Sequence, residues 1–383
     1  MSERLRAHTS RFVAGLALLA LLVGVAACGG GGGIEGGGST EVSTVEAESK
    51  PSGELTISNW PLYIDKQTIP DFEKATGVKV KYIEDINSPE EYFNKMQPLL
   101  AKGESGGRSL MMLPDYTVAK MHELGYVQAL DKAAMPDVEK NLIKSLRHPS
   151  FDPERSYTVP WASGMTGLIV NKELAPEIHS ICDLFESRYK GKVEFLNEAR
   201  ETVPLVMKCE GVDPETATEA DWMKAIDKIK AAAQSGQIRR FTGNEYVQDL
   251  LNGNVAAVIG WSGDGVQLEL EDPKLEWRMP TEGCMFWSEN AVIPVGAPNP
   301  TAAEAFMNYV YDPQHQAQLT ETINVVSPVE GVRPIIEKKG SDSANLKLIF
   351  PSSSFTKNCS SIPILKGEEE QNILQAFDSV LNE

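Results

Sequence analysis

The strongest constraint on the fold is a repeated alternation of short apolar strands and amphipathic helices. Residues 54–59 alternate apolar and polar side chains, which predicts a strand, and two further strands are predicted at 78–83 and 109–113. Helical periodicity fills the intervals between and after these strands, at 64–77, 90–101 and 117–124. Strands that alternate with helices indicate a sheet covered by helices, and ligands of such lobes bind beyond the carboxyl ends of the strands.

The alternation begins again after residue 163, so the sequence predicts a second lobe. Prolines and glycines make residues 157–164 a candidate hinge. Further strands are predicted at 166–171, 192–196 and 255–259, and further helices at 182–189, 202–209, 218–233, 246–252, 301–311, 314–321 and 371–381. Gly260, Gly263 and Gly265 are interpreted as turn glycines, because they match no dinucleotide-binding pattern.

The predicted fold class is α/β, with two doubly wound lobes joined by crossing hinge segments. The chain of 383 residues is long enough to give each lobe its own core. We expect the first lobe to comprise residues 53–163 plus 288–333, and the second to comprise residues 164–287 plus 334–383.

Residues 1–28 have the pattern of a targeting segment. Basic residues precede an apolar run at 12–27 that is too short for a comfortable membrane span. The run ends in Val-Ala-Ala before Cys28, which resembles the lipobox of bacterial lipoproteins. That resemblance implies cleavage before Cys28 and acylation of the cysteine, which would anchor the chain to the outer face of the cytoplasmic membrane. An uncleaved anchor helix or plain secretion is the alternative.

Residues 29–52 are rich in glycine, then in serine, threonine and glutamate, with few apolar side chains. Such a segment cannot bury enough surface to order itself, so we expect a flexible tether between anchor and fold. As a flexible chain it would span about 25 Å.

The charge balance and the cysteines limit the classes of partner. The net charge of −18 argues against a nucleic-acid binder and favours cationic partners, or serves only solubility. The histidines are scattered and there is no C-x-x-C motif, so we expect no metal and no cofactor. Cys182, Cys209, Cys284 and Cys359 could form two disulfides in an oxidising compartment. We suggest Cys182–Cys209 and Cys284–Cys359, although the sequence does not fix the connectivity.

Trp287 and Glu289 form the first candidate ligand-binding pair. Residues i and i+2 of an extended segment lie on one face, so the indole and the carboxylate point the same way. A π surface beside an anion suits an organic ammonium ion, since the ring attracts the cation and the carboxylate accepts its N–H bonds. The alternative is a core tryptophan beside a solvated glutamate.

Similar chemistry recurs at the ends of other predicted strands. Trp60 and Tyr63 follow the first strand, and Tyr116 follows the third. Trp261, with Asp264 three positions later, follows the strand at 255–259.

Glu198 and Glu201 lie just before the helix predicted at 202–209 and are three residues apart, so they share a face. Carboxylates at a helix start can also serve only the helix dipole or a cap, which is the alternative.

The order of these landmarks resembles the spermidine/putrescine-binding proteins of bacterial polyamine ABC transporters, within the extracellular solute-binding proteins. The resemblance extends from about Gly53 to Val332. The matching motifs are Asn59-Trp60 with Tyr63, Pro114 to Tyr116, Phe151-Asp-Pro153, Glu198-Ala-Arg-Glu201, Trp261, Gly283 with Phe286-Trp287, and Glu321-Thr-Ile.

The resemblance implies a type II-like periplasmic binding protein that holds its ligand between the two lobes. The ligand-binding residues it implies are Trp60, Tyr63, Tyr116, Glu198, Glu201, Trp261, Trp287 and Glu289. The implied function is capture of putrescine or spermidine outside the cell and delivery to an ABC permease. We expect a monomer.

Two other functions are weighed against this one. The same scaffold could bind another amine or an amino-acid-like solute, such as 4-aminobutyrate or an opine, with Arg200 holding a carboxylate. A glycosidase-like enzyme would use Glu198 and Glu201 as its two carboxylates. Residues three apart on one helix, however, lie on the same side of any ligand, and the sequence offers no nucleophile motif or phosphate loop. We therefore expect no enzyme.

Overall fold

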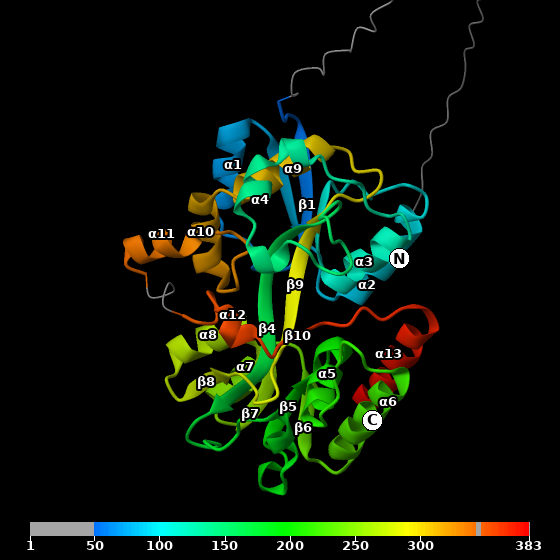
Figure 1. Cartoon of the computed structure of the whole chain (residues 1–383), viewed down its shortest axis with the longest axis vertical. Coiled ribbons are helices and arrows are strands. Elements are labelled where there is room, and N and C mark those ends of the chain that lie inside the picture. The colour runs from blue at the N-terminus through cyan, green and yellow to red at the C-terminus, as the bar shows by residue number, and fades with distance from the viewer. Residues whose placement is uncertain (1–49, 342–345, 383) are drawn as a thin grey trace, which may run out of the picture. The chain divides into compact units, whose positions relative to one another are not determined.

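Two antiparallel strands at the centre of one sheet connect the rest of the fold. The protein is described by a computed structural model that covers residues 50–341 and 346–382. Strand β4 spans Val159–Asn171 and strand β9 spans Met285–Val292. The two strands run side by side through the middle of the sheet (Figure 1). Gly164 of β4 lies opposite Trp287 of β9. Every residue of β4 is buried, as expected for a strand covered on both faces.

The predicted start of this strand at residue 166 is wrong, because β4 already begins at Val159 and runs through the candidate hinge. Pro160 is tolerated since the register shifts between Pro160 and Ala162, where a bulge interrupts the ladder. Gly164 is required by packing, because a Cβ atom there would lie 2.2 Å from Cζ2 of Trp287. The proline and glycine that suggest a loop therefore serve a bulge and a close contact.

The remaining strands extend the sheet on both sides, in the order β2-β1-β3-β9-β4-β7-β5-β6. Beside β9, three parallel strands are β1 (Glu54–Asn59), β2 (Lys79–Glu84) and β3 (Leu110–Pro114). Beside β4, three parallel strands are β7 (Ala257–Trp261), β5 (Val193–Leu196) and β6 (Ile238–Thr242). Strand β8 (Leu275–Arg278) also pairs with β4, and β10 (Ser360–Ser361) with β9.

Helices on either side of β4 and β9 bury separate apolar cores, and each set with its strands is called a lobe here. The first lobe contains α1 (Thr68–Thr76), α2 (Pro89–Leu100), α3 (Asp115–Glu123), α4 (Pro136–Asn141), α9 (Pro300–Val310), α10 (Pro313–Ile323) and α11 (Val332–Lys339). The second contains α5 (Ala199–Cys209), α6 (Glu219–Gln234), α7 (Tyr246–Leu251), α8 (Ser262–Glu271) and α13 (Gly367–Leu381). Short segments are α12 (Ser353–Thr356) and 3₁₀ turns at Lys132–Ala134, Lys144–Leu146, Ile181–Phe185 and Ser187–Tyr189.

The two-lobed α/β class is confirmed, whereas the residue boundaries between the lobes stay predictions. Local signals set many helix ends where the sequence places them. Helix α1 stops at Gly77, whose φ of 81° only glycine adopts without strain, and Thr218 with Asp221 forms a capping box for α6.

The interpretation of Gly260, Gly263 and Gly265 as turn glycines is wrong, because Gly263 and Gly265 lie inside helix α8 and Gly260 lies inside strand β7. Trp277 of β8 packs directly on Gly265, where a Cβ atom would lie 2.6 Å from the tryptophan Cβ. Gly265 is needed for the close packing of α8 on β8, which the local sequence does not reveal.

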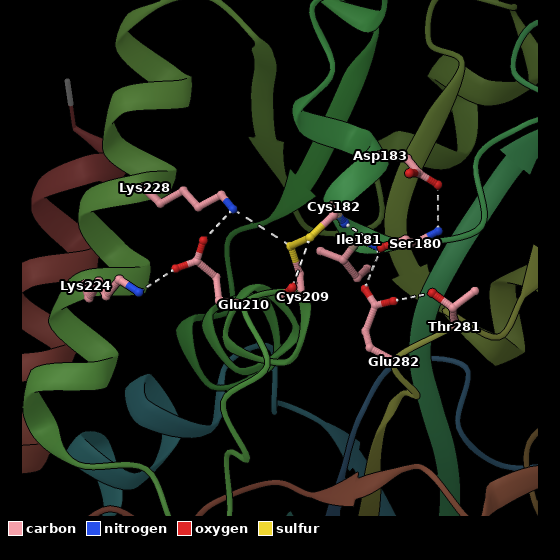
Figure 2. The surroundings of a disulfide bond; sticks show 10 residues. All are labelled: Ser180, Ile181, Cys182, Asp183, Cys209, Glu210, Lys224, Lys228, Thr281 and Glu282. Carbon is pink, nitrogen blue, oxygen red and sulfur yellow. Dashed lines mark hydrogen bonds and ion pairs between the residues drawn. A yellow bond between two sulfur atoms is a disulfide. The ribbon is translucent and has the colours of Figure 1, made fainter.

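Two disulfides join the cysteines as suggested from the sequence. Cys182–Cys209 joins a 3₁₀ turn to the end of α5. Figure 2 shows the Lys228 side chain directed at Glu210 and at Cys209. The Lys228 Nζ atom lies 2.7 Å from Glu210 Oε1 and 3.8 Å from Cys209 Sγ. Cys284–Cys359 ties the residue before β9 to the segment that leads into α13. The C-terminal segment is thereby fixed to the strand that carries Trp287 and Glu289.

The predicted signal peptide at 1–28, including Cys28, and residues 29–49 of the predicted tether lie outside the described residues. Within residues 50–341 and 346–382, no helix is both apolar and long enough to span a bilayer.

We expect both disulfides in the purified protein. Replacing Cys284 and Cys359 by serine should lower the free energy of unfolding by about 4.5 kcal/mol, and replacing Cys182 and Cys209 by about 3.5 kcal/mol. The difference follows from loop entropy, because the bridges close 75 and 27 residues. Denaturant unfolding measures both values. Free-thiol labelling of the denatured, unreduced protein, read by peptide mass spectrometry, contradicts the pairing if any of the four sites reacts.

Candidate ligand-binding site

The eight predicted ligand-binding residues lie at strand ends and on β9, and every one is half-buried. Trp60 and Tyr63 follow β1, Tyr116 follows β3 in the first turn of α3, and Trp261 ends β7. Glu198 and Glu201 stand at the start of α5, directly after β5. Trp287 and Glu289 lie two residues apart on β9. We call these eight residues the acidic–aromatic cluster.

Trp60 and Glu289 contact each other although 229 residues separate them. The indole Nε1 of Trp60 donates a hydrogen bond to Glu289 Oε2 at 3.2 Å. Glu289 reaches this position because β9 pairs with β3, with Pro114 opposite Glu289. Burial, and then the negative charge of Glu289, raises the pKa of Tyr63, so the tyrosine hydroxyl stays protonated beside the carboxylate.

Trp261 and Glu201 form the matching contact in the second lobe. The indole Nε1 of Trp261 donates to Glu201 Oε2 at 2.7 Å. The hydroxyl of Thr166 on β4 donates to the same oxygen, and Thr166 is the register partner of Trp261. In both lobes a tryptophan at a strand end therefore orients a glutamate through its N–H group.

The glutamates of the two lobes repel each other. Burial is the main cause that raises the pKa of Glu289 to about 8, and the charges of Asp115 and Glu201 raise it further. Burial also raises the pKa of Glu201 to about 7, although the hydrogen bonds from Thr166 and Trp261 oppose the shift. All these donors are neutral. The site therefore holds carboxylates whose negative charge the surrounding hydrogen bonds do not balance.

Glu198 adds a third carboxylate at the start of α5. Its pKa is raised to about 8, first by burial and then by the charges of Glu90 and Glu201, while Arg200 opposes the rise. Glu198 is the N-terminal cap residue of α5, yet its side chain makes no capping hydrogen bond. The structural alternative of a capping carboxylate is therefore wrong for Glu198.

Trp287 and Tyr116 provide aromatic surface from the two sides. The ring of Trp287 lies against Gly164 of β4 and packs on the cores of both lobes. Its indole Nε1 is buried and makes no hydrogen bond within the described residues. One face of Tyr116 is already occupied, because the Arg200 guanidinium lies 4.4 Å from the ring centroid.

Asp264, which lies three positions after Trp261, contacts the cluster through other residues. It accepts hydrogen bonds from Tyr246 and Asn244, and the Tyr246 hydroxyl accepts one from the Trp261 backbone N–H at 3.1 Å. This chain of contacts fixes the end of β7, so Asp264 is a positioning residue.

Sequence reasoning missed the network beneath Glu289. Asn290 donates to Asp115 at 2.6 Å and accepts from Arg155 at 2.8 Å, and Arg155 is buried. Asp152 receives the backbone N–H groups of Ser156 and Thr158 and so shapes the loop that places Arg155. Two features of the sequence could have indicated this network. Asp115 and Asn290 are the immediate sequence neighbours of Tyr116 and Glu289, and Asp152 lies in the Phe151-Asp-Pro153 motif.

Within the described residues, no group of three or more His, Cys, Asp or Glu side chains is arranged to hold a metal ion. The oriented carboxylate acceptors and aromatic faces of the cluster are groups that suit an organic cation.

Comparison with known proteins agrees with this chemistry. Residues 67–347 match the bacterial extracellular solute-binding protein family. The chain belongs to this family. A spermidine/putrescine-binding periplasmic protein of Escherichia coli (strain K12) is 25% identical over 323 residues, 84% of this chain and 90% of the relative.

Other members of the family show the same relation. A putrescine-binding periplasmic protein of Pseudomonas aeruginosa (strain UCBPP-PA14) is 25% identical over 354 residues, 87% of this chain and 93% of the relative. A solved structure from Listeria monocytogenes, described as a candidate spermidine/putrescine ABC transporter, has a TM-score of 0.75 at 26% identity and covers 85% of this chain and 98% of its own. The resemblance stated from the sequence is confirmed.

The carboxylate pKa values predict how the stability of the ligand-free protein depends on pH. The folded-state values near 7 and 8 lie above the ordinary value of 4.5, so the folded state retains protons that the unfolded state releases. Stability from this source is complete below about pH 4.5 and is lost as the pH rises to about 8.

Thermal unfolding at a series of pH values tests this expectation. Glu201→Gln and Glu289→Gln should each flatten the decline in stability between about pH 5 and 8, because each removes one of the carboxyl groups that titrates there. The control is Glu368→Gln, an exposed glutamate in the first turn of α13. A decline of equal slope in all four proteins would show that the two site carboxylates ionise normally.

Proposed function

We propose that the protein captures a polyamine such as putrescine or spermidine outside the cell and delivers it to an ABC permease. The observation that carries the proposal is the pairing of Trp60 with Glu289 and of Trp261 with Glu201. Two carboxylates from different lobes are held close enough to repel, each by neutral donors. A ligand with two protonated amines supplies the missing positive charges.

The aromatic rings complete this recognition. Indole and phenol faces attract ammonium groups and cover the methylene chain between them. Carboxylates buried without a cation are unfavourable, so the ligand stabilises the arrangement in which the lobes meet. We expect affinity in the micromolar range or tighter, about −8 kcal/mol or better. Relatives named for spermidine and putrescine binding support this ligand class.

The role proposed is binding without catalysis. Family members named as periplasmic binding proteins support both this role and a location outside the cytoplasm. An amine or amino-acid-like solute, such as 4-aminobutyrate or an opine, is the second candidate, because the guanidinium of Arg200 lies beside Tyr116 and Glu198. Calorimetric titration with putrescine, spermidine, spermine, 4-aminobutyrate and arginine separates the two, since heat only with the amino acids refutes the polyamine proposal.

Glu201→Gln should weaken putrescine or spermidine binding by about 2–5 kcal/mol, because it removes a buried partner of a ligand ammonium. Isothermal titration calorimetry measures the change. The control Glu210→Gln lies at the other end of α5, where Glu210 pairs with Lys224 and Lys228, and should leave affinity unchanged. Equal affinity of Glu201→Gln and the native protein would remove Glu201 from the site.

We further propose that Cys28 is acylated and anchors the protein to the membrane, as the lipobox-like segment indicates. In bacterial cells, Cys28→Ser should move the protein from the membrane fraction to the soluble extracytoplasmic fraction and abolish labelling by radioactive palmitate, because acyl chains supply the anchor. Immunoblots of the fractions read the result. Retention of the variant in the membrane with an uncleaved leader would favour a helical anchor instead.

A further inference from the structure

Arg200 is the one residue of the Glu198–Glu201 segment whose charge is opposite to that of the expected site. It stands between the two glutamates at the start of α5, and its side chain is only 4% exposed. Its guanidinium lies over the ring of Tyr116 and opposes the rise that burial and neighbouring carboxylates cause in the pKa of Glu198. A guanidinium beside a binding site is the usual partner of a ligand carboxylate.

Two acidic residues form ion pairs with the Arg200 guanidinium. Nη2 of Arg200 donates to Glu370 Oε1 at 2.5 Å, and Nε lies 3.4 Å from Glu90 Oε1. The Glu370 side chain is 11% exposed and also accepts from Lys120 of α3 at 2.8 Å. Glu370 therefore neutralises Arg200 from within the second lobe, while Glu90 and Lys120 reach these residues from the first.

The position of Glu370 does not depend on a ligand. Helix α13 packs into the second-lobe core through Ile373, Phe377 and Val380. The Cys284–Cys359 disulfide fixes the segment that leads into the helix. Glu370 also lies in the first turn of α13, where the helix dipole favours a carboxylate.

Arg200 retains capacity for a further acceptor. Its Nη1 is buried and has no hydrogen-bond partner within the described residues. Guanidinium groups bind carboxylates through two parallel N–H bonds, so an Arg200 released from Glu370 presents a suitable fork.

We propose that Glu370 determines specificity: by holding Arg200, it makes the site select ligands whose charged ends are all amines and reject ligands that end in a carboxylate. This inference rests on the proposed function, because it concerns the same site and ligand class. It is tested with putrescine and 5-aminopentanoate, which share the same methylene chain and differ at one end. Putrescine ends in a second ammonium group, and 5-aminopentanoate ends in a carboxylate.

Isothermal titration calorimetry of the full chain with both ligands provides the test. Glu370→Gln should strengthen 5-aminopentanoate binding about tenfold or more and weaken putrescine binding by a similar factor, because it adds about one uncompensated positive charge. The control Glu368→Gln changes an exposed glutamate in the same helical turn and should alter neither affinity. The double variant Arg200→Met/Glu370→Gln should lose the gain for 5-aminopentanoate, since the fork is then absent.

A second variant covers the case in which Glu370→Gln does not fold. Glu90→Gln removes the more exposed partner, whose side chain is 38% exposed, and should shift the ligand preference in the same direction but less. The role of Glu370 is overturned if the native protein binds putrescine and both glutamate variants keep the native ratio of putrescine affinity to 5-aminopentanoate affinity. Native protein that binds no amine would overturn the proposed function itself.

Discussion

The burial of Glu201 and Glu289 among neutral hydrogen-bond donors is the constraint on which the site depends. Glu201 belongs to the second lobe and Glu289 to the central strand β9, and burial raises the pKa of both. A carboxylate buried without a counter-charge resists ionisation, so an empty site has to retain protons or open. A cation removes the conflict and favours the arrangement that brings both glutamates together. The same carboxylates thus destabilise the closed site when it is empty and stabilise it when a cation is bound.

The sheet brings these opposed groups to one place. Strand β4 carries Thr166, which donates to Glu201, and pairs with both β7 and β9. Strand β9 carries Trp287 and Glu289 and pairs with β3 of the first lobe. The central strands thus carry Trp287 and Glu289 directly and hold Glu201 through Thr166.

The parts of the site that depend on local rules were predictable from the sequence. Trp287 and Glu289 share a face because strand side chains alternate, and Trp60, Tyr116 and Trp261 follow predicted strands. Features that depend on contacts between distant segments were not predicted. Gly164 and Gly265 are typical of turns, but each gives room to a tryptophan from a distant strand. The Arg155–Asn290–Asp115 network joins three separate segments, so no spacing in the sequence reveals it.

Arg200 shows why ligand class cannot be inferred from the site segment alone. It stands between Glu198 and Glu201 on one helix turn, so any movement of α5 carries the guanidinium together with both carboxylates. The net charge presented to a ligand must then be set by side chains from elsewhere. Here these side chains are Glu370 of α13 and Glu90 of α2, which lie far from residue 200 in the sequence. A change confined to the C-terminal helix can therefore alter which end groups the site accepts, while the cluster itself stays the same.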